Sequence, residues 1–140
     1  MFSKVLIAVD VALPQDTTAN LSAAAKLTQG WDAELHAVTV IPDVGMAIVG
    51  SYFSQDFETE GHKAAMEQLT TSLSEANLTA TPHVEIGKAY DRVLQLSKTL
   101  SADLIMIGAH QPDLSDYLLG SNASRVVRHS KQSVLVLRNQ

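Results

Sequence analysis

The sequence predicts an α/β fold built on a single doubly wound sheet of five parallel strands, with helices on both faces. Short apolar runs suited to buried strands alternate along the whole chain with longer segments of helical periodicity. A helical segment separates each strand from the next, and such crossovers join parallel neighbours in the right-handed sense. We therefore expect the element order βαβαβαβαβ and take the strand order in the sheet to be 3-2-1-4-5.

The first strand–helix–strand unit is the clearest part of the pattern. Residues Val5–Val9 form a continuous aliphatic run, which suits a strand buried on both faces. A helix is expected to begin near Asp16 and to end at Gly30. The second strand is Leu35–Ile41, and Pro42 stops it because proline has no backbone N–H to continue the ladder.

The middle of the chain holds the least regular segment, residues 43–56, which mixes glycines with apolar side chains. A long apolar loop there would be a lid over a ligand, a contact surface for a partner, or a segment packed on its own domain. The next helix is expected over residues 57–76, with Met66, Leu69 and Leu73 marking its buried stripe.

The second half repeats the alternation of strand and helix. Thr81–Ile86 alternates only weakly and carries polar side chains, so this strand is expected at an outer position of the sheet. A helix follows to Leu100, and Asp103–Ile107 is the fourth strand. After a long polar stretch, a helix starts at Gly120 and leads to the last strand, Ser133–Leu137.

The composition limits the possible functions. With 140 residues, 46% of them hydrophobic and 18% charged, the chain is expected to form one domain over residues 1–140. It has no cysteine, which excludes disulfides and thiolate metal sites. The net charge of −5, with only ten Lys and Arg, argues against nucleic acid as a partner. No apolar stretch approaches the ~20 residues of a membrane span, and no signal peptide precedes the first strand, so we expect a soluble cytoplasmic protein.

The topology predicts where a ligand would bind. In an open parallel sheet, ligands lie beyond the carboxyl ends of the strands, where the strand order reverses. With the expected order this point falls between strands 1 and 4, so Asp10, Gly108 and Val40 converge on one crevice. The carboxylate of Asp10 can accept hydrogen bonds from hydroxyl or amine groups of a ligand, and Gly108 lets a ligand approach the backbone. The alternative for Asp10 is that it only caps the following loop.

The segment that opens the last helix favours an anion. The first turn of a helix leaves backbone N–H groups unpaired at the positive end of the helix dipole. Gly120 lets a phosphate approach the main chain, while Ser121 can cap the helix and offer a hydroxyl, with Asn122 beside it. The alternative is that these three residues only form a good turn and helix cap. The segment is neither a Walker loop nor a GxGxxG motif.

Three segments resemble the universal stress protein family, and the likeness spans nearly the whole chain. They are Lys4–Asp10 at the start, Val38–Pro42 after the second strand, and residues 102–138. The resemblance implies a Rossmann-like fold of the adenine-nucleotide alpha hydrolase-like type. It also implies binding of ATP and an antiparallel homodimer through the last strand.

Family members that bind ATP share the pattern G-x2-G-x9-G-(S/T), followed by a helix and a strand of the type PVLVV. Gly108, Gly120 and Ser121 match the first and last parts of this pattern. Gln111 replaces the middle glycine, and the spacer before Gly120 is one residue short. The sequence around this spacer is more similar to the F/G-type branch, whose small bacterial cytoplasmic members have a related loop.

Under this resemblance the ligand is an adenine nucleotide: ATP, with or without Mg²⁺, or else AMP or ADP. Val40 would offer its backbone N–H and C=O groups to the adenine edge. Gln111 would donate to a phosphate oxygen, whereas His110 either contacts phosphate or is simply solvated. The full set of candidate cofactor-binding residues is Ala8, Val9, Asp10, Val40, Ile107, Gly108, His110, Gln111, Gly120, Ser121 and Asn122.

No catalytic or metal-binding constellation accompanies this site in the sequence. The leading interpretation is a stress-response regulator or sensor without a dedicated reaction, capable at most of slow ATP hydrolysis. One alternative is a nucleotide-independent dimeric interaction module, in which Gln111 and the shorter spacer have closed the pocket. Another is a weak ATPase or a phosphoryl or adenylyl transferase. The apolar edge strand Ser133–Leu137 predicts a homodimer, whereas the sequence identifies neither a protein partner nor the triggering stress.

Overall fold

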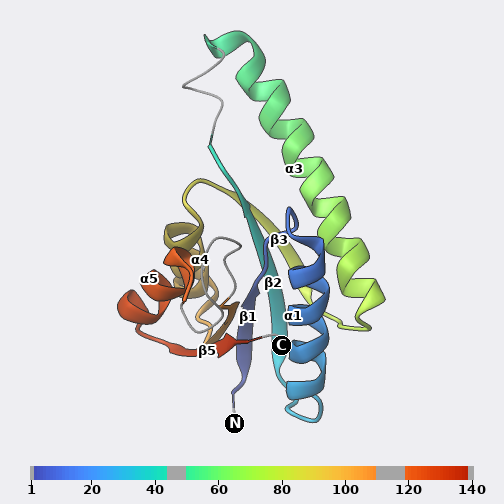
Figure 1. Ribbon diagram of the computed structural model, residues 1–140, viewed down its shortest axis with the longest axis vertical. Helices are drawn as coiled ribbons and strands as arrows, with labels where there is room; N and C mark the ends of the chain where they lie inside the picture. Colours follow the sequence, from blue (N-terminus) through green and yellow to red (C-terminus); the bar gives the residue numbers. More distant parts are fainter. Residues whose placement is uncertain (1, 44–49, 110–118, 139–140) are drawn as a thin grey trace.

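The computed structural model of the chain describes residues 2–43, 50–109 and 119–138. Its centre is one five-stranded sheet in which every neighbouring pair of strands is parallel (Figure 1). The strands are β1 (Lys4–Ala8), β2 (Glu34–Ile41), β3 (Thr81–Ile86), β4 (Leu104–Gly108) and β5 (Ser133–Leu137). Their order is β3-β2-β1-β4-β5, which confirms the predicted fold class and strand order.

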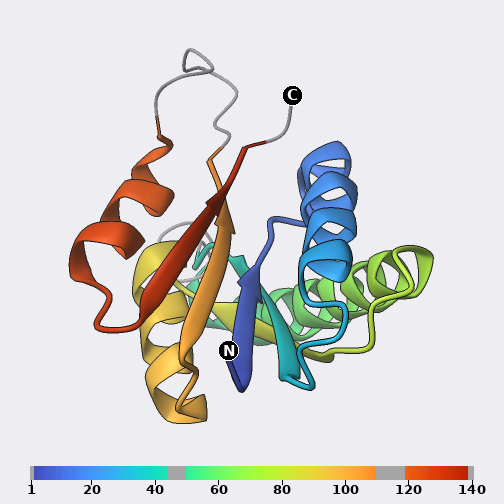
Figure 2. The same ribbon diagram turned by 90° about the horizontal axis from the view of Figure 1, so that it is seen from below.

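Helices cover both faces of this sheet. One face carries α1 (Pro14–Leu27) and α3 (Gly50–Glu75), and the other carries α4 (Ala89–Leu100) and α5 (Ser121–His129), as Figures 1 and 2 show. In the described part of the chain, no helix combines the length and the apolar character that crossing a membrane requires.

Strand β1 separates two apolar cores. Val5 and Ile7 pack toward α1 and α3, whereas Leu6 and Ala8 pack toward α4 and α5. Val5, Leu6 and Ile7 have no exposed surface at all. Burying side chains of this size stabilises the fold by roughly 1.5–3 kcal/mol each, so this short strand anchors both halves of the molecule.

Helix α3 begins earlier than predicted. It starts at Gly50, inside the segment 43–56 that we expected to be a loop, and it runs to Glu75. No proline or glycine interrupts residues 51–56, so nothing in the local sequence stops the helix from extending toward its start. Residues 44–49 of the predicted loop lie outside the described residues.

The stripe predicted for α3 is shifted slightly. Leu69 and Leu73 are buried as expected, whereas Met66 is only half-buried and Ala65 takes the inward position of that turn. The sequence spacing allows either residue to face the sheet, and the smaller side chain is the one that packs inward.

Strand β1 is also shorter than its neighbour β2 at the carboxyl edge of the sheet. β1 ends at Ala8, and Val9 N–H donates to the carbonyl oxygen of Val38 at 2.9 Å. β2 then continues to Ile41 without a partner strand in β1. An opening is therefore left beyond the end of the central strand.

Candidate functional site

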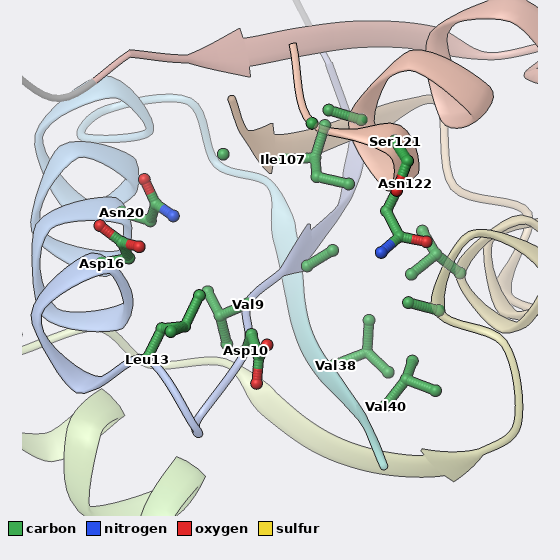
Figure 3. A pocket seen from close by; sticks show the side chains of 16 residues that line it. Val9, Asp10, Leu13, Asp16, Asn20, Val38, Val40, Ile107, Ser121 and Asn122 are labelled. Atoms are coloured by element: carbon green, nitrogen blue, oxygen red, sulfur yellow. The ribbon is translucent and has the colours of Figure 1, made fainter. Parts of the chain in front are cut away.

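A cavity of about 310 Å³ lies at the carboxyl ends of β1, β2 and β4, beside the first turns of α1, α4 and α5 (Figure 3). The predicted residues that line it are Ala8, Val9, Asp10, Val40, Ile107, Gly108, Gly120, Ser121 and Asn122. His110 and Gln111 lie outside the described residues. The structure thus brings together the three segments that the topology indicated, while ligand binding by these residues stays a prediction.

Further residues line the cavity that the sequence analysis did not select. They are Leu13, Asp16, Asn20, Val38, Ala89, Val93 and Ala123. The first three of these are Leu13, which caps α1, and Asp16 and Asn20 within the helix; their spacing of three and four residues places them on one side of the start of α1. That helical spacing behind Asp10 is the signal that could have found them.

One wall of the cavity is apolar and suits a flat ring. Val38 and Val40 lie on the same face of β2, with Val38 fully buried. Val93 of α4 and Ile107 of β4 are also buried and line the same space. An aromatic group placed there would exchange water contacts for aliphatic side chains.

Val40 also directs backbone polar groups toward this space. The carbonyl of Val38 accepts the hydrogen bond from Val9, so the backbone groups of Val38 face β1. Every second residue of a strand turns its N–H and C=O to the same side, hence those of Val40 face the same way. Because β1 ends at Ala8, these groups face the region beyond that strand.

The carboxylate of Asp10 organises the turn between β1 and α1. Its Oδ1 accepts a hydrogen bond from Ala12 N–H at 3.0 Å. The Asp10 carbonyl accepts from Leu13 N–H at 2.9 Å and from the Thr17 hydroxyl at 2.7 Å. The loop-capping role that we considered as an alternative is therefore present, and Asp10 lines the cavity as well.

The start of α5 differs in one respect from the expectation. Gly120, not Ser121, is the residue that caps the helix, and its carbonyl accepts the first helical hydrogen bond, from Ser124 N–H at 2.9 Å. Gly120 N–H donates to the carbonyl of Ala109 at 3.1 Å, so this amide is already engaged. An anion at this helix start would therefore meet the first-turn amides that follow Gly120.

The side chain of Asn122 links the starts of α4 and α5. Its Oδ1 accepts a hydrogen bond from Tyr90 N–H at 3.2 Å, which satisfies a first-turn amide of α4. With the oxygen held there, the amide nitrogen of Asn122 points into the cavity (Figure 3). The Arg125 guanidinium lies 4.8 Å from the centroid of the Tyr90 ring, a second contact between the two helices.

The electrostatics of the cavity are mixed. Its described lining carries two carboxylates, Asp10 and Asp16, and no basic side chain. Figure 3 shows Asp16 and Asn20 projecting from α1 on the wall opposite Asn122. Positive potential comes instead from the helix starts around the cavity. Among the described residues, no three His, Cys, Asp or Glu side chains gather in a way that could hold a metal ion.

Comparison with known proteins identifies the relatives of this chain. The model of the family described as "Universal stress protein family" matches residues 1–138. Universal stress protein G of Shigella flexneri is 34% identical over 145 residues, which cover 99% of this chain and 100% of the relative.

Solved structures share the fold. Protein MJ0577 of Methanocaldococcus jannaschii superposes with a TM-score of 0.73 and 22% identity, covering 100% of this chain and 98% of that one. A universal stress protein solved in complex with cAMP gives a TM-score of 0.67 at 21% identity, with 98% and 97% covered. At these identities the likeness establishes the fold, and it agrees with the observed strand order.

Gly108 is predicted to depend on Asn20. A Cβ atom at Gly108 would come within 2.5 Å of Asn20 Nδ2, and the Asn20 side chain is buried. We expect Gly108→Ala to lower the free energy of unfolding by about 1–3 kcal/mol, the usual range for overpacking. Asn20→Ala should restore part of this loss in the double variant. Urea unfolding of the four proteins measures the coupling, and effects that add to within about 0.5 kcal/mol would contradict the contact.

Proposed function

Because the chain belongs to the universal stress protein family, we propose that it binds an adenine nucleotide and acts as a stress-response regulator rather than as a dedicated enzyme. ATP is the first candidate ligand, and a cytoplasmic location is part of the proposal. The observation that carries it is the cavity itself, which joins an apolar slot to a helix start at the reversal point of a parallel sheet.

The parts of a nucleotide match the parts of this cavity. The adenine ring would lie beside Val38 and Val93, with its edge on the backbone groups of Val40. The ribose would lie near Asp10, and the phosphates at the first turn of α5. Because Asp10 and Asp16 add negative charge, a Mg²⁺ ion carried mainly by the phosphates would reduce the repulsion.

The comparisons support the class of ligand. One universal stress protein with the same fold has been solved in complex with cAMP, which contains the adenine, ribose and phosphate groups that we assign to the cavity. The transfer to this chain is our proposal, and it depends on the open cavity.

Nucleotide binding is expected to require the small residue at position 120. Gly120 is buried at the cap of α5, so Gly120→Val would crowd the helix start and displace its first turn from the phosphates. Wild-type protein should release adenine nucleotide on denaturation, detected by mass spectrometry, or gain several degrees in thermal midpoint with ATP. A ligand at a hundred times its Kd stabilises by about 2.7 kcal/mol. Gly120→Val should lose both responses.

The matched control is Val127→Thr, which changes an exposed side chain of the same helix outside the cavity. This variant should bind as the wild type does. If folded wild-type protein carries no nucleotide and shows no thermal shift with millimolar ATP, ADP or AMP, the nucleotide-independent module becomes the better account.

The Asn122 amide is expected to act as an oriented donor to the ligand. Tyr90→Pro removes the N–H that holds Asn122 Oδ1, at a first-turn position where proline is tolerated, and Tyr90→Ala removes the same ring but keeps the N–H. We expect Tyr90→Pro to bind ATP about fivefold more weakly than Tyr90→Ala, because one hydrogen bond contributes about 1 kcal/mol. Titration calorimetry of both variants measures the ratio, and equal Kd values would remove Asn122 from the proposal.

Self-association through β5 is the second part of the proposal. β5 is an outer strand, and its side chains from Val134 to Val136 are half-buried. Leu137 accepts the hydrogen bond from Ala109, so the backbone groups of Leu137 face β4. The alternation along a strand then turns the N–H and C=O groups of Val134 and Val136 outward. These groups and the apolar side chains around them suit pairing with a second copy of the chain.

A proline on the outward side of β5 should therefore prevent dimerisation without opening the sheet. Val136→Pro removes an outward N–H, and edge strands tolerate proline at such positions. Val136→Thr is the control, since it keeps the N–H and a β-branched side chain. Light scattering after size exclusion should give a dimer for wild type and Val136→Thr and a monomer for Val136→Pro; a dimeric Val136→Pro protein would place the interface elsewhere.

A further inference from the structure

Two histidines meet on the face of the sheet that α4 covers. His36 of β2 is 7% exposed, and its Nδ1 lies 2.9 Å from Nε2 of His83 on the outer strand β3. On its other side, His36 Nε2 lies 2.7 Å from Oε2 of Glu34. The two ring centroids are 5.1 Å apart. The function proposed above uses none of these three side chains.

The hydrogen-bonded series Glu34–His36–His83 can hold only a limited number of protons. An ionised carboxylate only accepts hydrogen bonds, so His36 Nε2 carries a proton toward Glu34. The space between His36 Nδ1 and His83 Nε2 then holds one further proton, which belongs to either ring. Both hydrogen bonds of this series can form when both rings are neutral or when one ring is charged. When both rings are charged, two N–H groups face each other and the hydrogen bond is lost.

The charged groups around the pair come from four elements. Lys4 of β1 lies 3.4 Å from the same Glu34 oxygen that His36 contacts. Glu85 of β3, two residues after His83, is bound by Arg92 of α4 at 2.9 Å. Burial lowers the pKa of His83, the neighbouring His36 lowers it further, and Glu85 raises it. The hydrogen bond from His36, followed by the charge of Lys4, lowers the pKa of Glu34, so this anchor stays ionised over the pH range in which His83 takes up a proton.

The pair adjoins the wall of the cavity. His83 lies directly across from Val38 in the pairing of β2 with β3, and His36 lies two residues before Val38 on the same face. Val38 lines the cavity. Arg92, which holds Glu85, precedes the cavity residue Val93 in α4. A change in the position of β3 would therefore reach the apolar wall from two sides.

We propose that Glu34, His36 and His83 form a proton-operated latch that holds the outer strand β3 against β2, and that acidification releases β3 and lowers the affinity of the adjoining cavity for nucleotide. The second half rests on the proposed function, whereas the first half does not. The latched state binds fewer protons than the released state, so protons favour release. At pH values above 6.5, the usual pKa of histidine, the latch stabilises β3. This stabilisation is lost as the pH falls from 6.5 toward the lowered pKa of His83.

Hydrogen exchange of the β3 amides tests the latch directly. Between about pH 7.5 and about pH 5.5, we expect their protection factors in the wild-type protein to fall by up to about tenfold, because pH 5.5 lies one unit below the ordinary histidine pKa of 6.5 that His83 regains on release. His83→Gln keeps a side-chain donor for His36 but cannot take up a proton, so its β3 protection should stay flat. The control His129→Gln, at an exposed position of α5, should behave as the wild type does.

The following outcomes would count against the latch. Wild-type β3 protection that does not change with pH, or an equal loss in His83→Gln, would overturn the latch. Stabilisation of wild type but not His83→Gln by zinc chloride at neutral pH would assign the pair to metal binding instead.

Nucleotide binding is read separately, by titrating ATP at both pH values. The Kd should rise on acidification in the wild type and not in His83→Gln. A pH-independent Kd would overturn the coupling to the cavity. If hydrogen exchange of the β3 amides depends on pH as expected but the protein binds no nucleotide at either pH, the latch stands and the proposed function is contradicted instead.

Discussion

The central strand β1 is the constraint on which the rest of the molecule depends. Its side chains are buried on both faces, so they must be aliphatic, and they divide the interior into two cores. The strand has five residues where β2 has eight, and the difference falls at the carboxyl edge. The cavity exists because the middle of the sheet stops early while the strand beside it continues. Burial of β1 and the opening at its end are thus two consequences of the same short segment.

Much of this arrangement was predictable from the sequence. The aliphatic run that ends at Asp10, the glycine at Gly108 and the small-residue helix start at Gly120 are local signals with a clear physical reading. The rule that ligands bind at the reversal of a parallel sheet then places these distant segments together. Both outer strands were also identified correctly, because weak alternation marks β3 and the last position follows from the strand order.

What the sequence could not supply is how side chains pair across elements. Nothing local indicates that Asn20 packs on Gly108, that Tyr90 orients Asn122, or that the amide of Gly120 is taken by Ala109. The pairing of His36 with His83 joins residues 47 positions apart and depends on the register of β2 with β3. The early start of α3 was not predicted for another reason. The helix propensity of a few residues is a weak signal, and an established helix can extend through them regardless.

The bond between Gly120 N–H and the carbonyl of Ala109 has a consequence for how this region can vary. It holds the end of β4 and the start of α5 next to one another. The number of residues between those two points then has little influence on the sheet or on the helix, because adding or removing one residue in the intervening segment changes the entropy of joining its ends only slightly. A spacer that differs by one residue from the family pattern can therefore be accommodated without disturbing the scaffold, and the segment is free to diverge in length and chemistry while its two ends stay in place.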